Sequence, residues 1–232
     1  MDKSRDNIEN MFNDIAPKYD VLNHILSMGI DREWRDKVVK EVSQHHPREI
    51  LDVAAGTCDL SIAIAKGCKD AHITAVDLSG EMLQVGRLKV KREDLEKQID
   101  IEKQDATEMS FQDGSVDVLT VAFGVRNFED LDKGLREFHR VLREDGHLYI
   151  LEFSKPRKGF FSVVYSLYFK HLLPFIGGVI SNNKRAYTYL PASVLSFPYG
   201  EEFEAKLREV GFRDVKSKQL TFGIATLYSA KY

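Results

Sequence analysis

Short apolar runs of strand length alternate with helical patterns through the middle of this chain, and this alternation constrains its fold more than any other feature. Between two of the runs, Leu131, Leu135, Phe138 and Leu142 recur at the spacing of one helix face. Such alternation predicts an α/β fold, a mostly parallel sheet with helices on both faces. The five runs expected to form strands are residues 50–54, 73–77, 99–103, 116–122 and 147–153.

Two further strands are expected near the end of the chain, at residues 215–218 and 224–229. The helical pattern before them ends at Gly211, a residue type that commonly terminates helices. A parallel pair needs a crossover of about a dozen residues, whereas these two strands are joined by a short connection. We therefore expect them to be antiparallel, which makes a seven-stranded, mostly parallel sheet with an antiparallel last strand.

A helical segment precedes the first strand. Four apolar residues have the spacing of one helix face: Ile8, Met11, Phe12 and Ile15. Trp34 marks a further helix that runs to about residue 44. Because the chain has no linker and no repeat, we expect a single domain over residues 1–232, with an N-terminal helical extension over residues 1–47.

A hydrophobic insert is expected at about residues 155–198. Its centre, residues 159–180, is long enough to raise the question of a membrane span, which needs about 20 apolar residues. Lys170 and His171 lie in the middle of this stretch, and Pro174 interrupts any helix there. A buried helical hairpin or an apolar lid is therefore the preferred interpretation.

Composition excludes several classes of protein. The 33 Lys and Arg residues against 36 Asp and Glu residues leave a net charge of −3, which argues against a main role in binding nucleic acid. Two cysteines without a CxxC pair exclude a disulfide framework and a cysteine-rich zinc site. The polar N-terminus has no apolar core of a signal peptide, so we expect a cytoplasmic location.

The turn after the first expected strand indicates a nucleotide-type cofactor. Asp77 ends the second strand 21 residues after Gly56, the distance at which an acid accepts hydrogen bonds from ribose hydroxyls. Asp52 and Asp59 flank the turn, and they would repel a dinucleotide pyrophosphate but suit an ammonium group. The turn also lacks the GxGxxG pattern. These features favour S-adenosylmethionine (SAM) over NAD, the alternative being a helix-capping acid beside a buried turn.

A second acid is expected at the same edge of the sheet. Asp105 follows the third strand and precedes Ala106, so its carboxylate can reach an adenine amino group while the alanine methyl packs on the ring. The alternative is that Asp105 is only a turn residue.

Five ordered segments resemble one family, the quinone-biosynthesis C-methyltransferases that act on ubiquinone and menaquinone precursors. The resemblance covers almost the whole chain. It rests on Tyr19-Asp20-Val21-Leu22-Asn23 with Ser27 and Trp34, Leu51–Leu60, Phe123-Gly124-Val125-Arg126-Asn127, Arg140–Ser154, and Tyr189–Pro198.

The resemblance implies a Rossmann-like class I SAM-dependent methyltransferase. It supports Thr57, Asp77, Asp105 and Ala106 as contacts of the cofactor, beside Gly56. It implies methyl transfer to a ring carbon of a reduced quinone that bears a polyprenyl tail. No metal is required, and the sequence has no cluster of metal ligands.

Catalysis requires a phenolate, because a ring carbon is a weak nucleophile until a neighbouring hydroxyl loses its proton. Arg126 and Asn127 follow the fourth strand, where a guanidinium can stabilise the phenolate, directly or through a water, and an amide can orient a hydroxyl. The alternative for Arg126 is an ion pair with Asp130 or Glu129. Tyr19 and Asp20 are expected to close over the quinol. His24, His139 and His171 are expected not to act as the base.

Five positions depart from the family pattern: Leu22, Asp31, Ala54, Cys58 and Ala122. Cys58 stands where the third of three alternate glycines allows close helix–strand packing. We expect a tolerated change and regard Cys58 as a nucleophile only as an alternative.

The apolar insert is expected to receive the prenyl tail or to meet the inner face of the membrane, with Lys170, Lys184 and Arg185 near anionic headgroups. Plain core and a homodimer interface are the alternatives. The short chain favours demethylmenaquinol as substrate. The benzoquinol precursor of ubiquinone, another small-molecule methyl acceptor, and a non-catalytic SAM- or lipid-binding module stay open.

Overall fold

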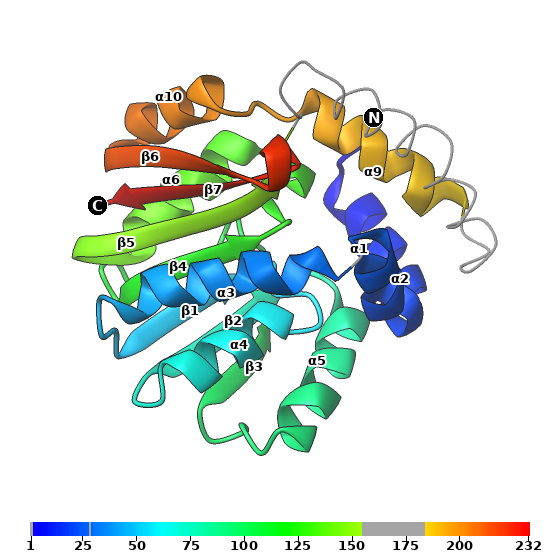
Figure 1. Cartoon of the computed structure of the whole chain (residues 1–232), viewed down its shortest axis with the longest axis horizontal. Coiled ribbons are helices and arrows are strands. Elements are labelled where there is room, and N and C mark those ends of the chain that lie inside the picture. The colour runs from blue at the N-terminus through cyan, green and yellow to red at the C-terminus, as the bar shows by residue number, and fades with distance from the viewer. Residues whose placement is uncertain (1, 28, 155–183) are drawn as a thin grey trace.

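Seven strands form one sheet in the computed structural model, which describes residues 2–27, 29–154 and 184–232 (Figure 1). Their order across the sheet is β3-β2-β1-β4-β5-β7-β6. β7 runs antiparallel to β5 and to β6, and the other neighbouring pairs are parallel, so the predicted fold class is confirmed. The strands are β1 (Glu49–Val53), β2 (His72–Asp77), β3 (Ile99–Lys103), β4 (Val116–Ala122), β5 (Leu142–Phe153), β6 (Arg213–Leu220) and β7 (Ala225–Lys231).

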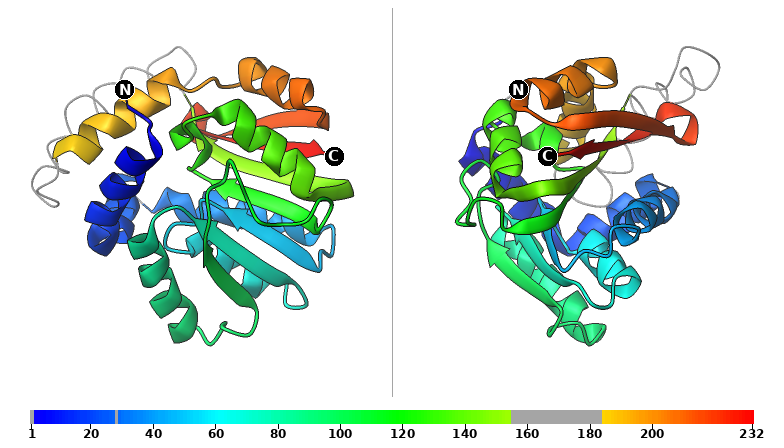
Figure 2. Two further views of the ribbon diagram at one scale, coloured as in Figure 1. Left: turned by 180° about the vertical axis from the view of Figure 1, so that it is seen from behind. Right: turned by 90° about the vertical axis from the view of Figure 1, so that its left-hand side faces the viewer.

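Helices cover both faces of the sheet (Figure 2). One face packs on α3 and α4, where Trp34 and Ile64 are fully buried, and the other on α6 and α10, where Phe138 and Phe203 are fully buried. These apolar stripes are the reason that the helices stay on the sheet. The described helices are α1 (Arg5–Ile15), α2 (Tyr19–Leu26), α3 (Ile30–Ser43), α4 (Asp59–Gly67), α5 (Gly80–Arg92), α6 (Leu131–Val141), α9 (Lys184–Ser196) and α10 (Glu201–Val210), with short 3₁₀ turns η1 (Ala16–Lys18), η2 (Val125–Asn127) and η4 (Thr221–Gly223).

The strand order reverses between β1 and β4, and this point sets the place of the site. The chain steps from β1 outward to β2 and β3, then returns to β4 on the other side of β1. Val53 pairs with Val76 and Val121, so the three strands end level with one another. Ligands of open α/β sheets bind beyond the carboxyl ends of the strands at such a switch point.

The N-terminal helices lie at this same edge of the sheet. α1 packs against α5 and α9, and α2 follows it across η1 (Figure 1). The centre of the predicted insert, residues 155–183, lies outside the described residues, and with it the expected hairpin or lid, Lys170 and His171. Within the described ranges, no helix is long and apolar enough to cross a membrane.

β5 begins five residues earlier than its apolar run predicts. Its first half carries Arg143, Glu144 and Asp145, and the pairing with β4 shifts register between Leu142 and His147. A β-bulge accommodates these charged residues at the end of the strand where the site does not lie.

Candidate active site

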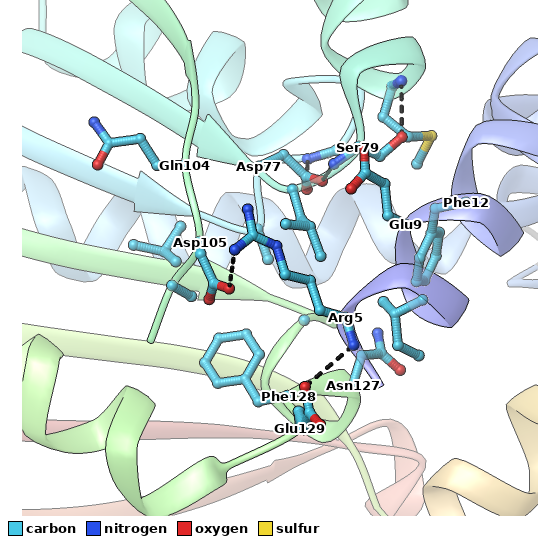
Figure 3. A pocket seen from close by; sticks show the side chains of 18 of the residues that line it. Arg5, Glu9, Phe12, Asp77, Ser79, Gln104, Asp105, Asn127, Phe128 and Glu129 are labelled. Carbon is cyan, nitrogen blue, oxygen red and sulfur yellow. Dashed lines mark hydrogen bonds and ion pairs between the residues drawn. The ribbon is translucent and has the colours of Figure 1, made fainter. Parts of the chain in front are cut away.

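A cavity of about 830 Å³, partly open to solvent, lies at the switch point between the sheet and the N-terminal helix (Figure 3). This volume includes the solvent-filled mouth of the cavity. Five of the predicted site residues line it: Gly56, Asp77, Asp105, Ala106 and Asn127. The lining that the described residues form does not include Thr57 or Arg126.

Asp77 presents a half-buried carboxylate to the cavity. One of its oxygens accepts a hydrogen bond from the Gly56 N–H and the other from the Ser79 N–H, both at 2.8 Å. Burial raises the pKa of this carboxyl, while backbone hydrogen bonds from Ser79, Gly56 and Leu78 lower it. Each carboxylate oxygen has a second lone pair, so the group can accept two further hydrogen bonds. This arrangement fits the two hydroxyls of a ribose.

The loop between β1 and α4 has three alternate residues in the left-handed backbone region. Ala54, Gly56 and Cys58 have φ angles of 53°, 56° and 62°. Glycine adopts this conformation without steric cost, whereas other residues rarely do. These are the three alternate positions at which the resembling family carries glycine. Backbone conformation is thus a second reason for small residues here, which the packing argument from sequence missed.

Cys58 is fully buried, and its sulfur packs on α5. A Cβ atom built on Gly86 would lie 2.6 Å from the Cys58 sulfur, so the thiol occupies the space that Gly86 leaves. Burial, helped by Asp52 and Asp77, raises the pKa of the thiol to about 12. The thiol stays protonated at neutral pH, which argues against the nucleophile alternative.

Asp52 and Asp59 do not take the positions that the charge argument gave them. Asp52 is fully buried beneath the loop and accepts hydrogen bonds from the Ser61 hydroxyl at 2.5 Å and the Thr120 hydroxyl at 2.8 Å. Asp59 forms an ion pair with Lys89. Of the four acids that the sequence placed near the cofactor, Asp77 and Asp105 are among the described residues that line the cavity, whereas Asp52 and Asp59 are not.

The Thr57 hydroxyl is directed toward the N-terminal helices. It donates to Asp20 at 2.5 Å and accepts from the Lys89 ammonium at 3.1 Å. Lys89 also donates to Asp20 at 2.8 Å, which closes a triangle between α2, the loop and α5. The structure therefore joins two predicted residues, Thr57 and Asp20, to each other.

Asp105 and Ala106 follow β3 and line the cavity. Asp105 accepts hydrogen bonds from the Thr107 N–H and hydroxyl, both at 2.8 Å, through the same oxygen. Its other oxygen lies 3.6 Å from the Arg5 guanidinium, which reaches across the cavity from α1 (Figure 3).

Arg126 is buried in an ion pair that sequence reasoning missed. Its guanidinium lies 2.9 Å from the carboxylate of Glu152, which is fully buried. Burial raises the pKa of Glu152, while Arg126 lowers it. The Nε of Arg126 has no hydrogen-bond partner among the described residues. The only signal of this pair in the sequence was an acid near the end of the fifth predicted strand.

The alternative given for Arg126, an ion pair with Asp130 or Glu129, is wrong. Asp130 instead caps α6 by accepting from the Lys133 N–H at 2.8 Å. Glu129 accepts from the Arg5 N–H at 3.1 Å.

Aromatic residues cover the cavity from the N-terminal side. Tyr19 lines it together with Phe12, and their ring centroids are 6.2 Å apart. Burial raises the pKa of Tyr19.

Among the described residues, the histidines considered as a possible base give no candidate. His139 stacks on Tyr232 near the end of the chain, and the side chain of His24 is outside the described residues. In the described part of the chain, no group of three or more His, Cys, Asp or Glu residues is arranged to hold a metal ion.

A model of the ubiE/COQ5 methyltransferase family matches residues 1–231. The chain belongs to this family. A ubiE/COQ5 relative, the demethylmenaquinone methyltransferase of Bacteroides fragilis, is 44% identical over 98% of this chain and 93% of its own length. The ubiquinone/menaquinone biosynthesis C-methyltransferase UbiE of Geotalea uraniireducens is 46% identical over 95% of this chain and 94% of its own length.

Solved structures agree on the fold. A SAM-dependent methyltransferase from Aquifex aeolicus has a TM-score of 0.59 at 19% identity, over 83% of this chain and 88% of that one. The [4+2]-cyclase SpnF has a TM-score of 0.69 at 14% identity, over 97% and 94%. With its family and its Rossmann-like fold, this ubiE/COQ5 chain is a SAM-dependent methyltransferase.

Proposed function

We propose that the protein methylates a ring carbon of a polyprenylated quinol, with demethylmenaquinol as the substrate. The observation that carries this proposal is one cavity in which a carboxylate suited to ribose, Asp77, faces an amide, Asn127, under the aromatic side chains of α1 and α2. Relatives from Bacteroides fragilis and Deinococcus radiodurans that are named demethylmenaquinone methyltransferases support this choice of substrate. The benzoquinol precursor of ubiquinone is the second candidate.

SAM is expected to lie along the carboxyl ends of β1, β2 and β3. Asp77 would hold the ribose hydroxyls, Gly56 would let the backbone approach closely, and Asp105 with Ala106 would hold the adenine. Bound SAM supplies an electrophilic methyl group. Thr57 contributes by tying this loop to α2 through Asp20, since its hydroxyl is already engaged there.

Asn127 and Arg126 are expected to act on the quinol. Asn127 lines the cavity, so its amide can donate a hydrogen bond to the ring oxygen that becomes the phenolate. Arg126 immediately precedes Asn127 and is buried. A positive charge in a buried position is screened less by water than one on the surface. Its charge lowers the free energy of the phenolate, and the phenolate increases the electron density on the ortho carbon.

Incubation with labelled SAM and a panel of demethylated quinols tests the proposal. We expect label in demethylmenaquinol and at least tenfold less in the benzoquinol. An Asn127→Ala variant should lose most of this turnover and retain its SAM affinity, measured by calorimetry. Equal labelling of both quinols would contradict the substrate assignment, and full turnover in the variant would contradict the role of Asn127.

The role of Arg126 needs a variant that leaves no unpaired buried charge. Removing Arg126 alone would strand Glu152, which typically costs about 3–5 kcal/mol. The double variant Arg126→Met with Glu152→Gln removes both charges together. We expect a normal melting temperature, unchanged SAM affinity and a large loss of turnover. Intact turnover would remove Arg126 from the mechanism.

Contact with the inner face of a membrane is proposed for the surface around α2 and α9. Val21 and Leu195 are 56% and 61% exposed on these helices. A Val21→Glu and Leu195→Glu double variant should bind vesicles of anionic phospholipid less well than the parent, with Leu88→Glu, an equally exposed leucine on α5, as control. The homodimer stays a prediction, which sedimentation of the purified chain checks.

A further inference from the structure

Tyr189 of α9 reaches the amide of Asn127 across 62 residues of sequence. Its hydroxyl donates a hydrogen bond to the Asn127 Oδ1 at a distance of 3.1 Å. Asn127 is 7% exposed and lines the cavity. One tyrosine outside the sheet therefore touches the residue that the proposed function places on the quinol.

An asparagine amide has an acceptor end and a donor end, and its neighbours decide which way round it lies. The Phe123 carbonyl, which can only accept, lies 3.5 Å from the Asn127 Nδ2. Tyr189 donates to the other end. Burial raises the pKa of Tyr189 to about 12, so its hydroxyl keeps a proton to donate. Both neighbours favour the same orientation of the amide.

This orientation leaves the donor end of Asn127 for the cavity. Nδ2 carries two hydrogens, and the Phe123 carbonyl engages one of them at most, at the limit of hydrogen-bond distance. The oxygen of the amide is turned toward the side on which α9 lies (Figure 3). Rotation of the amide by 180° would instead direct an oxygen against the Phe123 carbonyl.

We infer that Tyr189 is a positioning residue, which holds the Asn127 amide with an N–H directed at the ring oxygen of the quinol. This inference rests on the proposed function, since it assigns the way in which Asn127 acts. A developing phenolate accepts hydrogen bonds, so an N–H stabilises it and a carbonyl oxygen would repel it. The charges that act on Tyr189 come from Arg126 and Glu152.

The Tyr189→Phe variant removes the hydroxyl and keeps the ring. We expect kcat for demethylmenaquinol to fall by about tenfold, the rate equivalent of one oriented hydrogen bond. The pH–rate profile should move to higher pH, because the phenolate forms less readily without the N–H. SAM affinity should stay within about twofold. An unchanged pH profile would overturn the inference.

A double-mutant cycle separates this inference from the proposed function. If Tyr189 acts through Asn127, then Tyr189→Phe has no further effect on kcat in an Asn127→Ala background. A further loss in that background overturns the inference. Absence of label from every quinol in the parent enzyme would contradict the proposed function. If Asn127→Ala retains full turnover, the role of Asn127 fails and the inference fails with it. If Asn127→Ala loses turnover while Tyr189→Phe does not, only the role of Tyr189 fails.

Tyr228→Phe is the matched control. The Tyr228 hydroxyl is buried and accepts a hydrogen bond from the Gly200 N–H at 2.7 Å, apart from the cavity-lining residues. This variant also removes a part-buried hydrogen bond made by a tyrosine hydroxyl. We expect a lower melting temperature with an unchanged kcat and pH profile. A shift of its profile equal to that of Tyr189→Phe would make the effect a general consequence of lost stability.

Discussion

The two walls of the cavity are built by different kinds of interaction. On the sheet side, Asp77 is held by the N–H groups of Gly56 and Ser79, which are parts of the backbone. On the N-terminal side, α1 is tied across the cavity by side chains, through Arg5 with Asp105 and Glu9 with Lys103. The two basic side chains are 55% and 50% exposed.

The sheet side, with Asp77, is therefore called the fixed wall, and the N-terminal side, formed by α1 and α2, is called the cover. Hydrogen bonds to backbone groups follow from the sheet itself and persist as long as it does. Exposed ion pairs between long side chains contribute about 0–1 kcal/mol each and are screened by salt. The cofactor end of the site is therefore preorganised, while the exposed ion pairs that α1 forms across the cavity are weak enough to break when a ligand enters.

The largest expected effect is on the fixed wall, in Asp77→Asn. An amide has one acceptor oxygen, so a ligand hydroxyl and a backbone N–H both lose their acceptor. A hydrogen bond to a charged group is worth about 1.5–3 kcal/mol, so loss of the ligand bond alone should lower SAM affinity by about 10- to 150-fold. Calorimetry measures this, with Asp100→Asn on the neighbouring strand β3 as an exposed control. Tight SAM binding by Asp77→Asn would mean that the ribose lies elsewhere.

The second prediction concerns the acid beneath the fixed wall, Asp52. Burial raises its pKa from 3.8 to about 6. The folded state then keeps a proton that the unfolded chain releases, so this stabilisation is present below about pH 4 and is lost as the pH rises through 6. Asp52→Asn abolishes this dependence. Its free energy of unfolding relative to the parent should rise by at most about 3 kcal/mol from pH 4 to pH 7. Denaturant titrations at both pH values measure it; a constant difference would contradict the raised pKa.

A smaller effect is expected when the cover loses its connection to the loop. Asp20→Ala removes the acceptor of Thr57 and one partner of Lys89, which retains Asp59. The cost should be about 1 kcal/mol, and it should fall on α2. Amide hydrogen exchange over residues 19–26 should become about fivefold faster while β1 is unchanged. Asp36→Ala, which removes an exposed acid on α3, is the control. If the amides of residues 19–26 exchange at the same rate in both variants, the contacts of Asp20 do not hold α2 and packing alone does.

The smallest effect is the response to salt. Raising the salt from about 0.05 M to 0.5 M shortens the screening length below 10 Å and weakens the ties of Arg5 and Lys103. Exchange of the α1 amides should accelerate by a factor of about two, and exchange of β2 should not. If amide exchange accelerates in both α1 and β2, the two walls of the cavity are not held by different kinds of interaction.

The sheet was predictable because each strand has its own apolar run. Period and length place Ile73 and Val118 in strands without any knowledge of the partner strands. The early start of β5 was not predictable, because Glu144 and Asp145 belong to a strand only through the register of their neighbours. Local pattern thus predicts which strands exist better than where they begin.

Site residues were predictable where the strand end alone determines their place. Asp77 ends β2, Asp105 follows β3, and Asn127 lies in the turn after β4; all three line the cavity. The directions of the Thr57 and Arg126 side chains depend on Asp20, 37 residues away, and on Glu152, 26 residues away. A single sequence carries no signal for such pairs, so position could be predicted and orientation could not.

The close packing of Cys58 on Gly86 makes two positions on different elements depend on each other. A methyl group at 86 would overlap the sulfur, and a larger side chain at 58 would overlap α5. Alanine is the better helix residue at 86 by about 1 kcal/mol, and glycine is the better residue at the left-handed position 58. The two exchanges fit together in one protein. Gly86→Ala by itself would bring the new methyl group against the Cys58 sulfur, so it is tolerated only after Cys58→Gly. The order in which these mutations can accumulate is therefore determined by one sulfur atom.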